Sequence, residues 1–412
     1  MLEKLYTHSY VVKYIEAPLF PERDRFLAHR AEAGYSHSSL KLAANYQLKV
    51  MAYLKLSGER PVTLEEIDEA AQRWASRQPL LHLQLSRYRF THQATEWLKF
   101  LGWLKAPAPT AHPYAQVISQ FSQFMRDERG FAPVTIELRR KVVRNFLDHL
   151  WNRHIDLRNL SIKHLDQIVV SRFEEKRWSR RTMKANLEVL RAFLAYGEQR
   201  GLCPSGLAAQ IIAPRIYKGE NLPAGPDWET VRRLCASTQT NRPADIRDRA
   251  ILLLLAVYGL RASEVQRLTL DDIDWEKQRI QVRRSKSPER ADVYPLAEDL
   301  AEAILRYVRQ VRPRTQFREV FIRLSAPLRP FTPHAIGVMV RRRLKPMGVR
   351  LKWYGAHSLR HACACRLLAE GLSMKEIGDH LGHRSVFSTA IYAKLDLHAL
   401  REVANLSLEG LL

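Results

Sequence analysis

The stretch AILLLLAVYGLRASEV, residues Ala250 to Val265, joins the most apolar run of the chain to a single arginine, Arg261. The opening run is apolar on every side, which is typical of a helix buried in a domain core. Arg261 keeps its charge at any working pH and is costly to bury without an anionic partner. The stretch therefore predicts a helical core. It also raises the question of which other side chains would bind the anion that Arg261 requires.

The composition indicates a multidomain protein with an anionic partner. A chain of 412 residues is long enough for roughly two to four domains. Lys and Arg number 66 against 43 Asp and Glu, which gives a net charge of +23. Because the basic residues are spread through helical segments and not confined to a tail, we expect nucleic acid as the partner and not an anionic membrane.

The sequence gives no sign of export, of a membrane span or of a cofactor. Its first twenty residues lack the apolar core of a secretory signal, and the longest apolar run is too short to cross a bilayer. The 4 cysteines suggest a reducing compartment. Cys363 and Cys365 would point to different sides of a helix and cannot share a zinc ion. We therefore expect a cytoplasmic protein with no membrane partner, no metal and no other cofactor.

Two Pro-rich connectors, residues 105–113 and 213–227, divide the chain. The first segment and the second are similar: Gly34–Leu54 and Gly130–Leu150 align without a gap at an offset of 96 residues. Apolar spacing of three and four predicts a bundle of about four helices in each, so we expect a tandem duplication. The predicted domains are 1–110 and 111–215 (the two bundles), 225–394 (a third domain) and 395–412 (a C-terminal helix).

In each bundle the aligned segment is followed by a helix start with a capping hydroxyl, Thr63 in the first and Ser161 in the second. The third domain has a mixed pattern. Residues 279–296 alternate like two strands around a polar turn, and residues 319–324 predict a third short strand. Helical spacing covers Trp228–Cys235, Asp245–Val257, 298–311 and the chain from Thr332 onward. The fold class predicted is mainly α with a small antiparallel sheet in the third domain.

Five further side chains of the third domain could act on the anion that Arg261 would bind. Two arginines can clamp the non-bridging oxygens of a phosphodiester in its transition state. A tyrosine can attack phosphorus as a phenoxide, and a lysine can protonate the departing oxygen. In chain order the candidates are Arg261, Lys286, His357 and Arg360 in HSLRH, His383 in LGH, and Tyr392.

At these residues the chain resembles the tyrosine recombinases, the family of phage integrases and Xer-type recombinases. GLRASEVQRL is similar to the family's first arginine motif, HSLRHACACRLL to its H-x-x-R helix and LGHRSVFSTAIYAK to its LGH…Y ending. The resemblance covers roughly residues 114–393. It implies a SAM-like core-binding domain at 111–215 followed by the catalytic domain, and a C-terminal helix at 395–412 that is exchanged between protomers.

The resemblance also implies the roles of the phosphate-binding residues. Arg261 and Arg360 would bind the scissile phosphate. His357 would hydrogen bond to the phosphate region and act as a proton acceptor, and His383 would contact a non-bridging oxygen. Glu264, which is on the same helical face as Arg261, would support the site without binding the phosphate itself.

Lys286 and Tyr392 would carry the bond-breaking step. The resemblance implies that Lys286 is the acid for the leaving hydroxyl, and no other lysine occurs between Lys277 and Lys345. Tyr392 would attack and form a 3′-phosphotyrosyl link. Tyr354 is a rival nucleophile, but it precedes the H-x-x-R helix and is expected to be a packing aromatic.

The second bundle carries basic clusters on two helices, each of which starts near a Ser or Thr, as expected for contacts to DNA phosphates. These candidates are Arg139, Arg140, Lys141, Arg144, Arg177, Arg180, Arg181 and Lys184. The first bundle has only Lys41 and Lys49 on the matching helix, so we expect from it a weaker contribution to phosphate binding.

The resemblance implies the partners and the biological setting. Double-stranded DNA with an inverted-repeat site would be the substrate, bound by a homotetramer in the synapse, alone or with sister recombinases. The protein would be nucleoid-associated and would integrate, excise or transpose a mobile element through a Holliday junction. Two alternatives stay open: a type IB topoisomerase with the same chemistry, and a non-enzymatic DNA-binding accessory protein.

Overall fold

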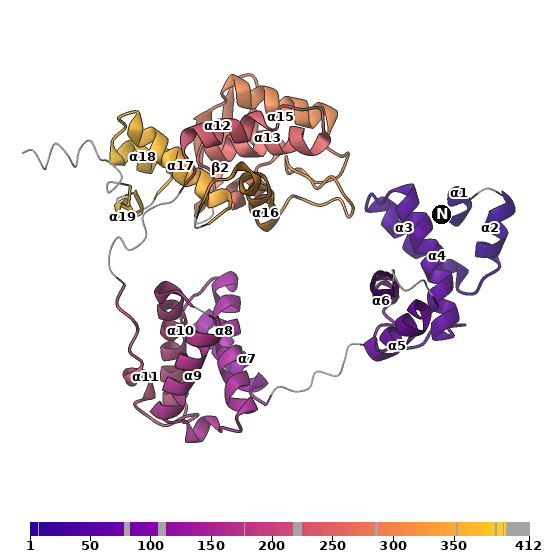
Figure 1. Ribbon diagram of the computed structural model, residues 1–412, viewed down its shortest axis with the longest axis horizontal. Coiled ribbons are helices and arrows are strands. Elements are labelled where there is room, and N and C mark those ends of the chain that lie inside the picture. Colours follow the sequence, from indigo (N-terminus) through magenta and orange to yellow (C-terminus); the bar gives the residue numbers. More distant parts are fainter. Residues whose placement is uncertain are drawn as a thin grey trace, which may run out of the picture. The chain divides into compact units, whose positions relative to one another are not determined.

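The computed structural model describes residues 1–6, 8–77, 83–105, 113–176, 178–216, 225–284, 287–351, 353–383, 385–389 and 391–392. Its contacts divide the chain into two units, Met1–Lys105 with Asn221–Leu412 and Ala106–Glu220. Most of the described residues are helical, and the strands are confined to one small sheet (Figure 1). The predicted fold class is therefore confirmed. Within the described ranges, no helix has the length and apolar character needed to span a membrane.

The N-terminal segment is a helical bundle whose core is formed by Phe90, Trp97, Val50 and Ile67. Thr63 caps the third of its long helices as predicted, because its hydroxyl accepts from the Glu66 amide at 3.2 Å. The helices are α1 (Leu2–Leu5), α2 (His8–Ile15), α3 (Phe20–Glu32), α4 (His37–Leu54), α5 (Leu64–Ala75) and α6 (Leu83–Leu101).

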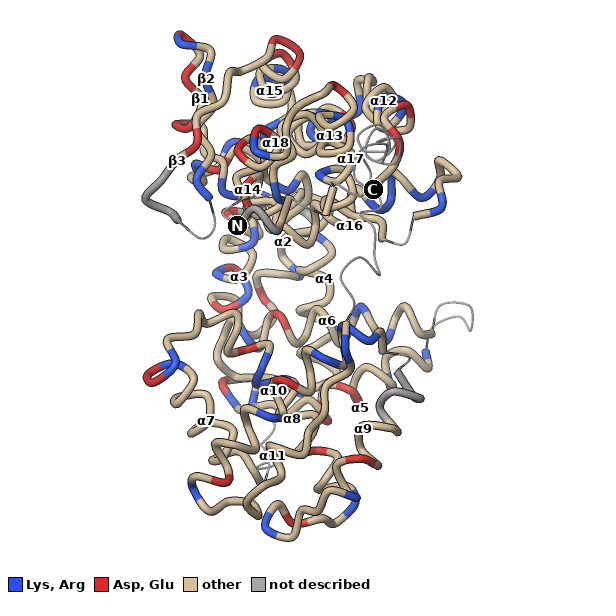
Figure 2. Tube along the Cα trace, turned by 90° about the vertical axis from the view of Figure 1, so that its left-hand side faces the viewer, with Lys and Arg blue, Asp and Glu red and all other residues tan. Residues whose placement is uncertain are grey.

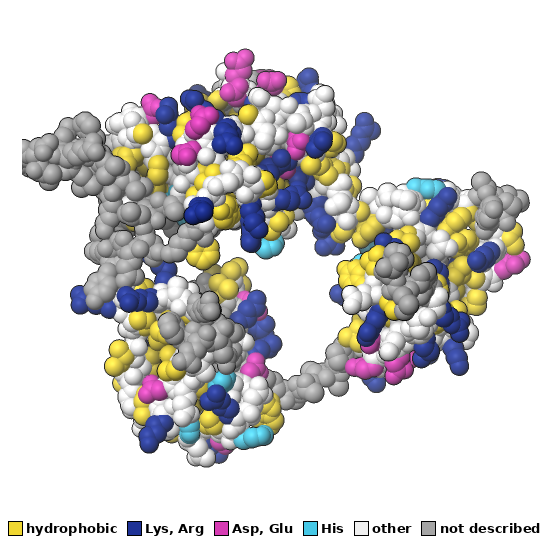
Figure 3. All heavy atoms as spheres, in the orientation of Figure 1, with side chains coloured by type: hydrophobic (Ala, Val, Ile, Leu, Met, Phe, Trp, Pro, Cys, Tyr) yellow, Lys and Arg dark blue, Asp and Glu magenta, His cyan; other side chains and the backbone are white. Residues whose placement is uncertain are grey.

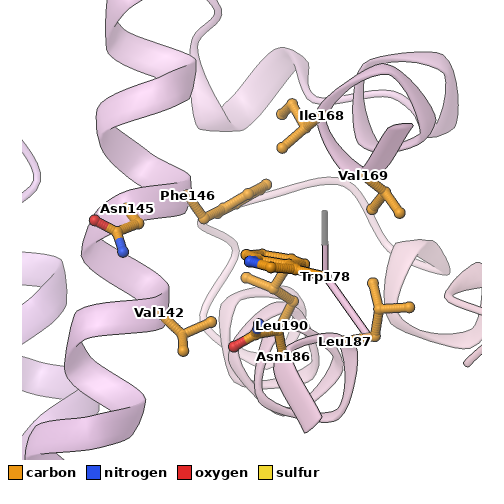
Figure 4. A pocket seen from close by; sticks show the side chains of 9 residues that line it. All are labelled: Val142, Asn145, Phe146, Ile168, Val169, Trp178, Asn186, Leu187 and Leu190. Carbon is orange, nitrogen blue, oxygen red and sulfur yellow. The ribbon is translucent and has the colours of Figure 1, made fainter. Parts of the chain in front are cut away.

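The second unit is a bundle of four long helices around Phe121, Phe146 and Phe193. Ser161 accepts a hydrogen bond from the His164 amide at the start of the third of these helices, as predicted. The helices are α7 (Ala115–Asp127), α8 (Pro133–Asn152), α9 (Ile162–Lys176), α10 (Arg180–Gln199) and the short α11 (Leu207–Gln210). A pocket of about 50 Å³ opens between α8, α9 and α10 and is lined mainly by apolar side chains, with Trp178 at its centre (Figure 4).

The long helices of the two bundles follow each other in the same order and at nearly the same spacing. Between their first residues, α3 and α7 are 95 positions apart, α4 and α8 are 96 apart, α5 and α9 are 98 apart, and α6 and α10 are 97 apart. The long helices of the two bundles thus recur at matching intervals, and the tandem duplication stays a prediction.

The C-terminal domain is built around α13, of which Leu252, Leu254 and Leu255 are fully buried. α13 packs beside α15 (Figure 1). The helices are α12 (Trp228–Ala236), α13 (Pro243–Ala256), α14 (Ala262–Arg267), α15 (Glu298–Gln310), α16 (Pro333–Leu344), α17 (Ala356–Ala369), α18 (Met374–Leu381) and α19 (Val386–Thr389). The sheet is antiparallel in the order β1 (Ile273–Asp274), β2 (Arg279–Arg284), β3 (Ser287–Pro295).

The predicted hairpin over residues 279–296 is confirmed as β2 and β3, with Ile280 opposite Tyr294. The prediction of a third strand at residues 319–324 is wrong, since Glu319 and Ile322 make only isolated bridges and β1 completes the sheet. Val320 and Phe321 are fully buried, so the apolar pattern reflects core packing and not strand pairing.

Candidate active site

The turn between α13 and α14 places Arg261 at the start of α14, and it requires a glycine. Gly259 has φ +60°, and a Cβ atom there would lie 2.4 Å from Cδ2 of Leu381. A side chain at this position would be strained by the backbone and would push α18 away. The glycine therefore lets the α13–α14 turn lie against α18, the helix that precedes His383.

Glu264 fixes Arg261 at two points. One carboxylate oxygen, Oε2, accepts from the Arg261 amide at 2.8 Å, and the other, Oε1, accepts from the Arg261 guanidinium at 2.8 Å. Glu264 is buried, whereas the Arg261 side chain is 39% exposed. Arg261 is thus held from the protein side and keeps part of its guanidinium open to an incoming group.

Arg284, at the end of β2, joins three parts of the site. It donates to Glu264 Oε2 at 2.9 Å and to Asp292 Oδ2 at 2.6 Å, and it also contacts the Tyr294 hydroxyl. The Tyr294 hydroxyl donates in turn to the His380 carbonyl at 2.6 Å. Arg284 therefore connects Glu264, which holds Arg261, to the β2–β3 hairpin and to the end of α18.

No local motif marks Arg284 as a site residue, although the pattern of β2 contains a signal for it. Side chains of β2 alternate between exposed and buried, and Arg284 falls on the buried face with Ile280 and Val282. A charged residue on the apolar face of a strand needs a buried partner. Its partners, Glu264 and Asp292, are in other segments of the chain.

Arg360 lies on α17 and is only 1% exposed. Its guanidinium donates to the carbonyl oxygens of Gly259 at 2.5 Å and Leu381 at 2.6 Å. Burial and the nearby charge of Arg261 lower the pKa of Arg360 to about 10. In the described part of the chain no carboxylate forms an ion pair with it. A buried guanidinium held by carbonyls alone is suited to receiving an anion.

The two predicted histidines lie close to these arginines. His357 begins the first turn of α17, where burial and the charges of Arg360 and Arg261 lower its pKa. His383 follows α18, and its Nδ1 lies 2.7 Å from the Thr389 hydroxyl. Burial and the same two arginines lower the pKa of His383 to about 4. Both rings are therefore neutral at neutral pH, and the positive charge of the site comes from arginine.

Tyr392 packs against Cys363 and Ala364 of α17 and against Ile377 and Leu381 of α18. Burial raises the pKa of its phenol, and the charge of Arg360 acts in the opposite direction. Its hydroxyl lies 2.8 Å from Nδ1 of a histidine that the sequence analysis did not select, His361.

The structure thus brings Arg261, Glu264, His357, Arg360, His383 and Tyr392 into one region of the C-terminal domain. Lys286 falls outside the described residues, and so do Arg177 and the predicted C-terminal helix. Tyr354 packs on the domain core, and its hydroxyl donates to the Val349 carbonyl and accepts from the Leu351 amide. These contacts give the rival tyrosine a structural role.

The described candidate DNA-binding residues of the second unit lie on α8 and α10 (Figure 2). Lys141, Arg144 and Arg181 are exposed. Arg140 forms an ion pair with Glu137 at 2.8 Å, and the Arg139 guanidinium lies 4.1 Å from the centre of the Phe131 ring. The remaining described candidates are Arg180, which is exposed, and Lys184, which is half-buried.

Other basic residues are in the C-terminal domain and the first bundle. Arg341 and Arg342 of α16 are exposed, and Figure 3 shows Lys and Arg side chains clustered near this helix. In the first bundle the Lys49 ammonium lies 4.2 Å from the centre of the Trp74 ring, and Lys41 lies over Tyr6. Both lysines lie over aromatic rings, and the weaker phosphate contribution expected from that bundle stays a prediction.

Solved structures share this architecture. A XerH site-specific recombinase bound to palindromic difH substrate matches with a TM-score of 0.54 and 20% identity, over 70% of this chain and 84% of that one. The Tn1549 transposon integrase in complex with a circular intermediate DNA matches with a TM-score of 0.52 and 18% identity, over 67% of this chain and 94% of that one. The fold is that of a tyrosine recombinase catalytic domain with an N-terminal helical region.

The sequence relationships define the family. The phage integrase family profile matches residues 227–398. The integrase/recombinase y4rF of Sinorhizobium fredii is 31% identical over 418 residues, which cover 98% of this chain and 95% of that protein. Tyrosine recombinase XerC of Actinobacillus succinogenes is 27% identical over 69% of this chain and 95% of that one. The chain belongs to the phage integrase family of tyrosine recombinases, enzymes that cleave and rejoin DNA strands.

Proposed function

We propose that the protein is a site-specific recombinase in which Tyr392 is the nucleophile and a 3′-phosphotyrosine is the covalent intermediate. The observation that carries the proposal is the state of Arg360: a guanidinium that is 1% exposed, bound by two backbone carbonyls, with Arg261 near enough to lower its pKa. Two arginines that repel each other inside a protein are stabilised when a phosphodiester binds between them.

In the cleavage step, one bond to phosphorus forms and another breaks. The Tyr392 oxygen forms a bond to phosphorus as the bond from phosphorus to the 5′ oxygen breaks, and the phenol proton passes to the neutral ring of His357, the proton acceptor that the family resemblance implies. Arg261 and Arg360 hold the non-bridging oxygens, where negative charge develops. The neutral rings of His357 and His383 can hydrogen bond to the phosphate region without adding charge. Lys286 protonates the departing 5′ oxygen, as the family resemblance implies.

Rejoining reverses the same step. A 5′ hydroxyl of a second strand attacks the phosphotyrosine and gives its proton back to Lys286, the bond from phosphorus to Tyr392 breaks, and His357 returns a proton to the phenol. A first exchange of strands gives a Holliday junction and a second resolves it. The energy of each phosphodiester is kept in the phosphotyrosine bond, so the reaction needs no high-energy cofactor.

We further propose that the substrate is duplex DNA with inverted repeats and that four protomers form the synapse. The net charge of +23 and the exposed basic residues of α8 and α10 support DNA binding. The related structures are of XerH on a palindromic substrate, a lambda integrase dimer on a core site and an integrase of the Tn1549 transposon. They favour integration, excision or transposition of a mobile element as the biological role.

The test is covalent capture on nicked duplexes that carry the DNA flanking the gene. The nick lets a short strand diffuse away after cleavage, so that the phosphotyrosine accumulates. We expect a protein–DNA adduct at the 3′ side of the break that forms equally well in EDTA and in Mg²⁺, because arginines supply the positive charge. An adduct at the 5′ side, or one that requires Mg²⁺, would contradict the proposed chemistry.

A further inference from the structure

Tyr392 lies where a phosphodiester cannot reach it. The residue is 1% exposed and belongs to an apolar cluster with Cys363, Ala364, Ile377 and Leu381. A nucleophile must approach phosphorus directly, so a buried phenol has to leave this position before it can attack. In the position described here, the phenol is therefore not aligned for attack.

One polar contact holds the phenol in this position. The Tyr392 hydroxyl and Nδ1 of His361 lie 2.8 Å apart, and the two ring centres are 5.7 Å apart at an interplanar angle of 61°. Among the described residues, His361 is the only one that hydrogen bonds to this hydroxyl.

His361 is linked to the phosphate site through its own helix. His357 is one turn earlier on α17, and the two imidazoles meet edge to face with ring centres 4.4 Å apart. His357 is close enough to Arg360 and Arg261 for their charges to lower its pKa. Ring and hydrogen-bond contacts therefore connect His357 through His361 to Tyr392, and His357 lies within the electrostatic influence of the two arginines.

We propose that His361 is a positioning residue that holds the Tyr392 hydroxyl in the DNA-free enzyme, and that a phosphodiester bound at Arg261, His357 and Arg360 releases it. The proposal rests on the proposed role of Tyr392 as the nucleophile. Burial, His357 and Arg360 lower the pKa of His361 to about 4, so the ring is neutral and can accept the phenol hydrogen. A nucleophile released only beside bound phosphate is protected from attack on the wrong group.

The first test probes Tyr392 in the full chain without DNA, by tetranitromethane nitration and peptide mass spectrometry. His361→Phe keeps an aromatic ring beside His357 but removes the acceptor, and His361→Asn keeps a polar atom near the Nδ1 position. We expect Tyr392 nitration to rise roughly two- to tenfold in His361→Phe, as for the loss of one hydrogen bond, and to change little in His361→Asn. Tyr88, which is 66% exposed, and the fully buried Tyr307 are internal references.

The second test measures single-turnover cleavage of a nicked duplex by the same variants. If the contact only holds Tyr392 back, His361→Phe should cleave roughly two- to tenfold faster than the wild type, with unchanged DNA affinity. Loss of cleavage in both variants would overturn the proposal and make His361 a proton acceptor in the reaction. Equal nitration of Tyr392 in all three proteins would overturn it as well.

The two tests separate this proposal from the proposed function. Nitration requires no DNA and reports on the His361 contact even if another residue is the nucleophile. An adduct that persists in Tyr392→Phe would refute the proposed function while leaving the nitration result intact. If His361→Phe does not fold, as judged by circular dichroism, His361→Leu replaces it as the variant without an acceptor.

Discussion

The guanidinium of Arg360 donates to the backbone carbonyl of Gly259 at 2.5 Å, across 101 positions of sequence. This contact joins α17 to the turn that carries Arg261. The turn that carries Arg261 therefore also orients the guanidinium of Arg360. The protein fold itself holds both candidate phosphate-binding arginines in place. Such preorganisation is what an enzyme needs where charge develops in a transition state.

Replacing Arg360 should impair cleavage far more than binding. Loss of one transition-state contact of this kind costs roughly 10²–10³-fold in rate. One phosphate contact among many changes DNA affinity little. We expect this split for Arg360→Ala and for Arg261→Ala in single-turnover cleavage and in filter binding at fixed salt. Parallel losses of cleavage and affinity would indicate a structural role instead.

Arg284→Ala should destabilise the C-terminal domain and reduce cleavage. The change leaves the buried carboxylate of Glu264 with Arg261 alone, and removing one partner of a buried ion pair costs about 3–5 kcal/mol. Arg279→Ala is the matched control, because Arg279 is exposed on the same strand and such a change is within about 0.5 kcal/mol. Hydrogen exchange of β2 and α14 would measure both. Equal protection in the two variants would refute a central role for Arg284.

Gly259→Ala should disturb the site through the backbone. A methyl group would lie 2.4 Å from the Leu381 side chain, at a residue with φ +60°. We expect a loss of roughly 2–4 kcal/mol from overpacking and strain together. Gly337→Ala is the control, since nothing lies within 4 Å of its added methyl and alanine favours a helix. A Gly259→Ala protein as stable as Gly337→Ala would contradict this account.

The sequence indicates candidate site residues more readily than the side chains that support them. Arg261, Arg360, His383 and Tyr392 are recognisable because local motifs carry them. Arg284 is not, because its contact to the His380 carbonyl spans 96 positions and depends on how the hairpin packs. The motif does not indicate the role of His361 either, because its partner Tyr392 comes from a different segment of the chain.

The pairing of strands in the sheet likewise depends on tertiary contacts and not on local sequence. Residues 319–324 have the composition of a strand, and Val320 and Phe321 are fully buried. Which segment pairs with β2 depends on tertiary contacts, and β1 takes that place. Periodicity indicates which residues are buried, but it does not identify the partner of a strand.

The C-terminal domain should lose stability as the pH falls from about 6.5 to about 4. His361 and His383 have pKa values of about 4 in the folded state, below the ordinary value of 6.5. Between these values the unfolded chain binds protons that the folded protein does not, so stability rises with pH. Each histidine contributes at most about 1.4 kcal/mol per pH unit.

Hydrogen exchange of α17 amides at several pH values would measure this slope for the C-terminal domain alone. His361→Asn and His383→Asn should each make the slope shallower, because an amide does not titrate in this range. Slopes identical to that of the wild-type protein would show that the two histidines are not held neutral.

The central claim is that Tyr392 forms the covalent bond to DNA, and adduct formation by paired tyrosine variants tests it most directly. The measurement is the yield of protein–DNA adduct on a nicked duplex for the wild type, Tyr392→Phe and Tyr354→Phe, with DNA affinity measured in parallel. We predict normal binding by all three proteins, adduct with the wild type and Tyr354→Phe, and none with Tyr392→Phe. An adduct formed by Tyr392→Phe would contradict the account, and its loss in Tyr354→Phe would identify Tyr354 as the nucleophile.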